Sequence, residues 1–110
     1  MSTAVLVNSA ANSISDTIQP FYTSPSGGAG TRISAFTATN NTDSNKTYEA
    51  FIYGPSQSGL GAVMPRKIVI TNKFDTGGAL INQLIPPGGS LNMRTNIAGS
   101  IDFRVTGDEL

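Results

Sequence analysis

The sequence predicts an all-β protein: an antiparallel β-sandwich of the immunoglobulin-like or jelly-roll type with an extended N-terminal arm. Short runs of β-branched and aromatic residues recur, and turn-forming residues separate them about every 8–12 residues. No segment gathers helix-forming residues at the helical period of about 3.6. The chain has 110 residues, enough for one domain. We expect an arm over residues 1–20 and a sandwich over residues 21–110.

The first half of the chain supplies the arm and three predicted strands. Residues 1–20 hold one apolar run, Val5–Val7, which we interpret as a short strand within the arm. Phe21–Thr23 is a short strand that ends in a Ser/Pro/Gly loop. In Arg32–Thr39 the apolar residues change face, which predicts a bulge or a strand buried on both sides. Tyr48–Tyr53 is apolar on both faces, which indicates a central strand or one covered by a neighbouring subunit.

The second half alternates further predicted strands with turns. Gly54–Pro65 is a predicted loop, because it holds three Gly and two Pro. Arg66–Thr71 and Ala79–Ile85 are predicted strands, and Phe74–Gly78 is the predicted turn between them. These elements continue the regular spacing of the first half.

The C-terminal part closes the predicted sandwich. Pro86–Gly89 is the sharpest chain break in the sequence. Leu91–Arg94 follows as an alternating strand, and Asn96–Gly99 is a turn. In Ile101–Thr106 the apolar residues alternate with polar ones, which predicts one buried and one solvated face.

The composition argues against several classes of function. Without Cys or His, the chain lacks thiolate ligands, the commonest general base and the commonest metal ligand. Seven basic residues balance seven acidic ones, whereas a nucleic-acid binder needs a basic face. No apolar run approaches the roughly 18 residues of a membrane helix, and the first residues lack the basic start of a signal peptide. We expect no cofactor, no metal, no nucleic acid and no membrane partner.

The low charge content points to a protein partner. Only 13% of the residues are charged, whereas surfaces of small soluble domains usually carry about 25–35%. A neutral surface rich in Ser, Thr, Asn and Gly is typical of one that a partner partly covers.

Four motifs invite a chemical interpretation. Asp75-Thr76-Gly77 matches the aspartic-protease triplet, but no apolar strand precedes it, and a turn is the simpler interpretation. Asn40-Asn41-Thr42 and Asn45-Lys46-Thr47 match the glycosylation triplet, which carries little information without a signal peptide. Asp102 and Arg104 share one strand face, where a surface ion pair would contribute about 0–1 kcal/mol.

An aromatic group raises the possibility of sugar binding. Tyr48, Phe51 and Tyr53 stand close together in one strand, and aromatic faces suit sugar C–H groups. Because the strand is continuously apolar, packing in a core or subunit interface is the favoured interpretation.

Several stretches together resemble a known class of proteins. Phe21-Tyr22-Thr23 leads into a Ser/Pro/Gly loop, then Thr31-Arg32-Ile33 and a polar Asn–Thr turn. Leu84-Ile85-Pro86-Pro87-Gly88-Gly89-Ser90-Leu91 follows, and Phe103-Arg104-Val105-Thr106-Gly107-Asp108-Glu109 closes the run. From residue 20 onward this order resembles small virion structural proteins of tailed bacteriophages, which decorate capsids or serve as tail adaptors or fibre modules. The turn Asn96-Ile97-Ala98-Gly99 lacks the Asp that often ends the corresponding turn in that class.

The resemblance implies assembly without catalysis. We expect a non-enzymatic head decoration or cement protein that binds the major capsid lattice in the virion, after assembly in the bacterial cytoplasm. The alternatives are a tail adaptor, baseplate or fibre module that binds tail proteins, and a carbohydrate-binding β-sandwich. A homo-oligomer is implied, with a trimer favoured. We expect no catalytic residues. The partner contacts are expected in the arm and in the 54–65 loop, at Val5, Leu6, Val7, Ile14, Ile18, Leu60, Val63 and Met64.

Overall fold

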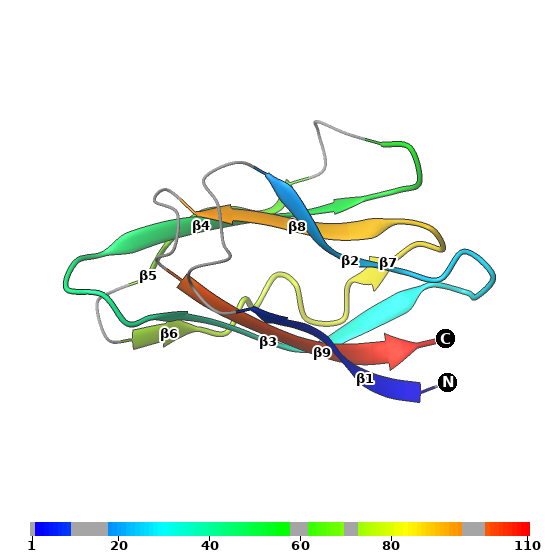
Figure 1. Ribbon diagram of the computed structural model, residues 1–110, viewed down its shortest axis with the longest axis horizontal. Helices are drawn as coiled ribbons and strands as arrows, with labels where there is room; N and C mark the ends of the chain where they lie inside the picture. Colours follow the sequence, from blue (N-terminus) through cyan, green and yellow to red (C-terminus); the bar gives the residue numbers. More distant parts are fainter. Residues whose placement is uncertain (1, 10–17, 58–61, 70–72, 96–100) are drawn as a thin grey trace.

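The fold is an antiparallel β-sandwich, as predicted (Figure 1). The computed structural model describes residues 2–9, 18–57, 62–69, 73–95 and 101–110, and within these ranges all regular structure is strand. The strands are β1 (Ser2–Ser9), β2 (Gln19–Thr23), β3 (Thr31–Asn40), β4 (Lys46–Tyr53), β5 (Ala62–Val69), β6 (Lys73–Asp75), β7 (Leu84–Ile85), β8 (Ser90–Thr95) and β9 (Ile101–Glu109).

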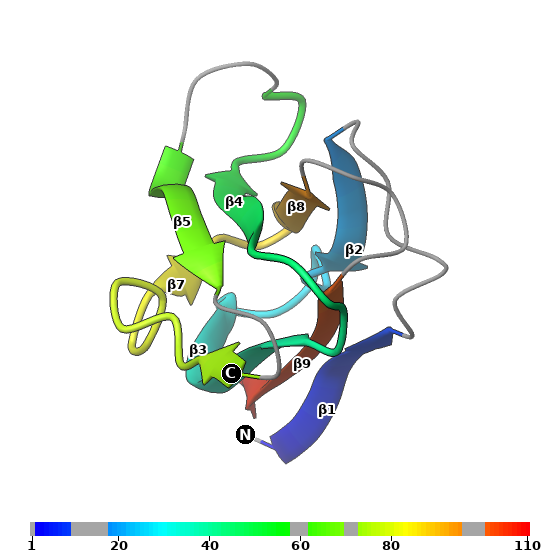
Figure 2. The same ribbon diagram turned by 90° about the vertical axis from the view of Figure 1, so that its left-hand side faces the viewer.

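Two sheets pack face to face around one core (Figure 2). The five-stranded sheet has the order β1-β9-β3-β6, and β7 pairs with β3 on the same side as β6. The four-stranded sheet has the order β2-β8-β4-β5. Strands β1 and β2 lie at one margin of the sandwich, and β5 and β6 lie at the other.

Residues 2–9 differ from the expected arm, because they form β1, an integral strand of the sandwich. Strand β1 pairs antiparallel with β9, and its Leu6 and Val7 side chains are buried in the core. The register shifts between Val5 and Val7, so both apolar side chains can point inward. Gly107 permits this close approach, since a Cβ there would lie 2.9 Å from Leu6 Cδ1. The predicted strand at Val5–Val7 exists, but its partner is the chain's own sheet.

The alternation predicted for β9 and the bulge predicted in β3 are confirmed. In β9, Ile101, Phe103 and Val105 are buried, and the residues between them are at least partly exposed. In β3 the pairing with β9 shifts between Ile33 and Ala35. This irregularity is the predicted bulge. It keeps Ile33, Phe36 and Ala38 together on the core side, and Ala35, which was expected to share a face with Ile33, is exposed instead.

Three segments of the second half fold differently from the prediction. The expected strand Ala79–Ile85 is mostly turn, with a strand only at Leu84–Ile85, and Leu80 fills the core from this turn. Backbone hydrogen bonds join Asn82 N and Gln83 O to Ile33, so the apolar run is buried without extending a sheet. The expected turn Phe74–Gly78 begins within β6, because Phe74 and Asp75 are strand residues, and the expected loop Gly54–Pro65 ends in the first residues of β5.

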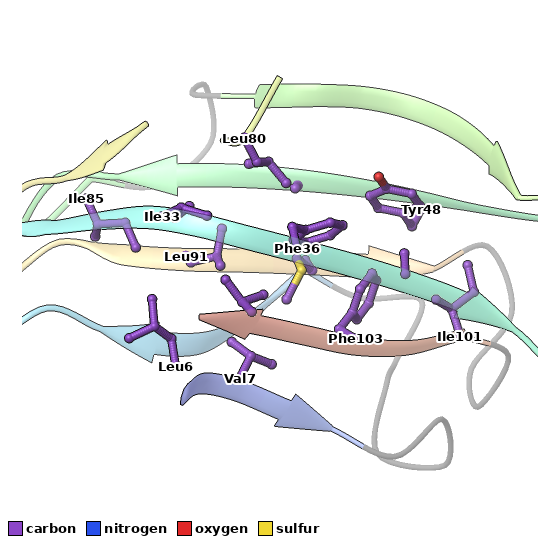
Figure 3. Packing of buried hydrophobic residues seen from close by; sticks show 14 of the residues in the cluster. Leu6, Val7, Ile33, Phe36, Tyr48, Leu80, Ile85, Leu91, Ile101 and Phe103 are labelled. Carbon is purple, nitrogen blue, oxygen red and sulfur yellow. The ribbon is translucent and has the colours of Figure 1, made fainter. Parts of the chain in front are cut away.

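The core contains a central group of aromatic rings (Figure 3). The ring centroids of Tyr48 and Phe103 lie 5.5 Å apart, and Phe36 lies 5.7 Å from Tyr48. Phe21 extends the group, at 6.3 Å from Phe103. These rings come from both sheets and pack the two layers together, since offset and edge-to-face ring pairs add to the energy of burial.

Candidate binding surface

The outer face of the five-stranded sheet carries an apolar depression between β3 and β9. Directly opposed residues of an antiparallel pair lie on the same face of the sheet. Val5 of β1 opposes Thr106 of β9, and Thr106 opposes Ala35 of β3. Arg104 opposes Thr37 in the next outward-facing row. The same face also carries the charged residues Arg32, Asp102 and Asp108, because their pairs Arg32–Asp108 and Thr39–Asp102 face outward like Ala35–Thr106.

A shallow depression of about 210 Å³ lies on this face. It is lined by Ala35, Phe36, Thr37, Arg104 and Thr106. The depression lies next to the bulge of β3, and the short side chains of Ala35 and Thr37 form part of its lining. The depression can receive an apolar side chain, with the Arg104 guanidinium beside it for an aromatic ring or a carboxylate.

Two large exposed apolar side chains lie at the margins of the same sheet. Phe74 of β6 opposes Thr39 of β3, which faces outward like Thr37, and its side chain is 63% exposed. Val5 lies at the other margin of the same sheet and is 50% exposed. In the sequence, the feature that could have indicated this surface is Phe74 itself, an apolar residue placed between the charged Lys73 and Asp75.

The outer face of the four-stranded sheet is closed by comparison. Phe51 and Tyr53 point outward from β4, yet each is only 6% exposed, and their ring centroids lie 6.0 Å apart. Beside them, Arg94 of β8 forms an ion pair with Glu49 at 2.9 Å. Tyr48 lies on the other side of β4, in the core. A sugar-stacking platform needs an open ring face, and none of these three aromatic side chains offers one.

A polar network joins the C-terminal end of β9 and the start of β3 to β2. Tyr22 Oη donates to a carboxylate oxygen of Glu109, and it lies 2.8 Å from Thr31 Oγ1. Ser24 Oγ lies 2.8 Å from the same Thr31 oxygen. Burial raises the pKa of Tyr22, and the hydrogen bond to Glu109 raises it further. This cluster links β2 of one sheet to β3 and β9 of the other, which is a structural role.

The Asp75-Thr76-Gly77 triplet, expected to be a turn, has Asp75 as the last residue of β6, and the turn itself follows from Gly78. Asp75 Oδ2 accepts hydrogen bonds from Gly77 N at 3.1 Å and from Tyr48 Oη at 2.5 Å. Burial raises the pKa of Tyr48 far above its usual range, and the hydrogen bond to Asp75 acts in the same direction. The carboxylate therefore ends β6 and satisfies a core phenol.

The glycosylation triplet at Asn40 and the expected Asp102–Arg104 pair both have side chains that make local hydrogen bonds. Asn40 has no exposed surface, and its amide donates to Val69 O and Ser44 O, both at 2.9 Å. Its nitrogen is therefore inaccessible to glycosylation in the folded chain. Asp102 accepts from Asn41 Nδ2 at 3.3 Å, and no ion pair between Asp102 and Arg104 is found within the described ranges.

The residues expected to contact a partner lie in different environments in the structure. Leu6 and Val7 lie in the core, so they do not face a partner, whereas Val5 is exposed on the candidate surface. Ile18 is half-buried just before β2. Val63 and Met64 belong to strand β5 and not to a loop. Ile14 and Leu60 lie outside the described residues.

Comparisons of the chain with protein-family models, with curated proteins and with solved structures found no match. The described ranges contain no helical segment with the length and hydrophobicity needed to span a bilayer. Among the same residues, no group of three or more acidic side chains is placed to hold a metal ion.

Proposed function

We propose that this chain is a non-enzymatic virion structural protein of a tailed bacteriophage, most simply a head decoration or cement protein. One observation carries the proposal: the two faces of the sandwich differ. The outer face of the five-stranded sheet exposes Val5 and Phe74 and has an apolar depression, whereas Phe51 and Tyr53 on the outer face of the other sheet are covered. Exposed apolar patches on small soluble proteins mark interaction surfaces.

The anatomy of this surface suits a protein partner. Aromatic side chains and Arg are the residues that most often dominate interface energies. Phe74 is 63% exposed and would supply an aromatic anchor once it is covered. Arg104 borders the depression and would select a carboxylate or an aromatic ring on the partner. The capsid lattice repeats such contacts many times, so that a modest affinity per site stabilises the whole shell.

The described carboxylates support a structural role. Glu49 pairs with Arg94, Asp75 accepts from Tyr48 and Gly77, and Glu109 accepts from Tyr22. Each of these acidic side chains therefore holds together elements of the fold.

The second candidate function keeps the virion and places the chain in the tail, as an adaptor, baseplate or fibre module. The same open sheet face would serve there. The carbohydrate-binding alternative has less support, because Tyr48, Phe51 and Tyr53 are all buried.

The copy number of the chain in purified particles tests the proposal. Quantitative mass spectrometry would compare it with the major capsid protein. Hundreds of copies per particle would support the head decoration, and multiples of three or six would support the tail alternative. Absence from particles would refute both.

A binding assay tests the surface itself. Particles that lack the chain would be titrated with purified protein carrying Phe74→Ala or Arg104→Ala. We expect each variant to bind at least tenfold more weakly, which is about 1.4 kcal/mol. Arg94→Ala is the matched control, because Arg94 lies on the outer face of the other sheet, and it should bind as the parent does. Full affinity of both test variants would show that another surface makes the contact.

A further inference from the structure

Strand β1 is an open edge of the five-stranded sheet. It pairs with β9 along one side, and no described strand pairs with its other side. The strand is eight residues long, which is long for an edge. Its free backbone N–H and C=O groups form a template on which another strand can pair.

The other edges of the sandwich carry protection that β1 lacks. Proteins block exposed edges with Pro, with charged side chains or by keeping the strand short. Strand β2 contains Pro20, and β5 contains Pro65, Arg66 and Lys67. Strands β6 and β7 are three and two residues long. The β1 sequence STAVLVNS has neither a charge nor a Pro. Strand β1 has a register shift between Val5 and Val7, but among the described strands it is the one long edge without a Pro or a charge.

We propose that β1 pairs antiparallel with β1 of a second copy of this chain, across a two-fold axis, so that two five-stranded sheets become one continuous sheet. A two-fold axis brings identical residues of the two strands together. In most edge strands this would oppose like charges, which is destabilising. The uncharged β1 has no such repulsion, so the edge is complementary to itself.

Val5 locates the axis. It stands near the middle of β1, faces outward opposite Thr106, and is half-exposed. Directly opposed residues of an antiparallel pair share a face, so an axis near Val5 places it against the partner's Val5. Leu6 and Val7 point into the core of their own copy. The pairing would cover the exposed apolar side chain at this margin and join the candidate binding surfaces of both copies.

This two-fold pairing differs from the trimer that the resemblance implies, and it does not depend on the virion proposal. The chain alone is sufficient to test it. Failure of the copy-number experiment would leave the pairing intact, and failure of the pairing would leave the virion proposal intact.

Charge-swap variants at Val5 give a decisive experiment. Sedimentation velocity over a wide concentration range should show a dimer for the parent chain. Val5→Lys and Val5→Glu should each weaken dimerisation at least tenfold, because like charges would meet across the axis. An equimolar mixture of the two variants should restore a dimer, since Lys then meets Glu. Thermal unfolding followed by circular dichroism would confirm that each variant is folded.

Phe74→Lys is the matched control, because Phe74 is the exposed apolar residue at the opposite edge of the same sheet. It should leave the dimer unchanged. A parent chain that is monomeric at every concentration would overturn the proposal. So would an oligomer that Val5→Lys does not weaken, or a mixture of folded Lys and Glu variants that fails to associate.

Discussion

Two valines of β1 provide a matched test of how this strand is built into the fold. Val7 is 4% exposed and packs in the core, whereas Val5, two residues away, is 50% exposed. Val5→Ala and Val7→Ala make the same chemical change in the same strand. If β1 belongs to the sandwich, the two substitutions must differ greatly in their effect on stability.

The expected difference follows from burial. Val→Ala removes two methyl groups, at about 0.8 kcal/mol for each buried carbon. The cavity left between Val7 and its neighbours raises the loss to about 2–3 kcal/mol. For Val5, exposed on the sheet surface, the loss should stay within about 0.5 kcal/mol. For a domain of this size, Val7→Ala should lower Tm by roughly 8–12 °C.

Thermal and urea unfolding, followed by circular dichroism, would measure both effects. The samples should be dilute, so that association of copies does not add to the apparent stability. An arm lying free of the sandwich would make both substitutions nearly neutral. Equal and small changes would therefore refute the placement of β1 in the sheet.

Three further predictions address the turns and the core. Asn40→Ala removes a fully buried side chain that makes four hydrogen bonds, and urea titration should show a loss of about 3 kcal/mol; a loss below about 1 kcal/mol would contradict this role. Gly77→Ala places a Cβ 2.4 Å from a Phe36 ring carbon at φ +57°, whereas a Cβ at Gly78 meets nothing within 4 Å. Thermal unfolding should show that Gly77→Ala lowers the free energy of unfolding by about 2–4 kcal/mol and that Gly78→Ala leaves it almost unchanged. Because burial, and then a hydrogen bond to a carboxylate, raise the pKa of Tyr48, the folded state holds the phenol proton more tightly than the unfolded chain. The free energy of unfolding of the parent chain should therefore fall as pH rises above about 10. The free energy of unfolding of the Tyr48→Phe variant should fall less steeply over the same range. Equal slopes for the two proteins would contradict this coupling.

Local patterns predicted the strands whose two faces differ in environment. The alternation of Ile101, Phe103 and Val105 predicted β9, and the change of face in β3 predicted its bulge. Both signals arise within a few residues, because a pleated strand alternates its side chains between faces. The class of the fold followed from these strands and from the turns between them.

Properties that depend on distant partners were not predictable in this way. Residues 79–85 are as apolar as a strand, but Leu80 enters the core from a turn that bonds to β3. The apolar run Val5–Val7 gave a strand without indicating that β9 would pair with it. The exposure of Phe74 likewise depends on β6 lying at a sheet edge. A sequence pattern indicates how apolar a segment is, whereas the residues that the segment contacts depend on the topology of the fold.

The position of β9 has a consequence for how the chain folds. Strand β9 lies between β1 and β3, so these two earlier strands of the five-stranded sheet can complete their pairing only after the C-terminal strand has been made (Figure 1). Pairings between residues so far apart in sequence close large loops and make folding slow. Until β9 is available, β1 and β3 expose unpaired backbone, and a nascent or truncated chain is prone to aggregate. Yield during expression should therefore respond more to temperature and chaperones than the stability of the finished sandwich suggests.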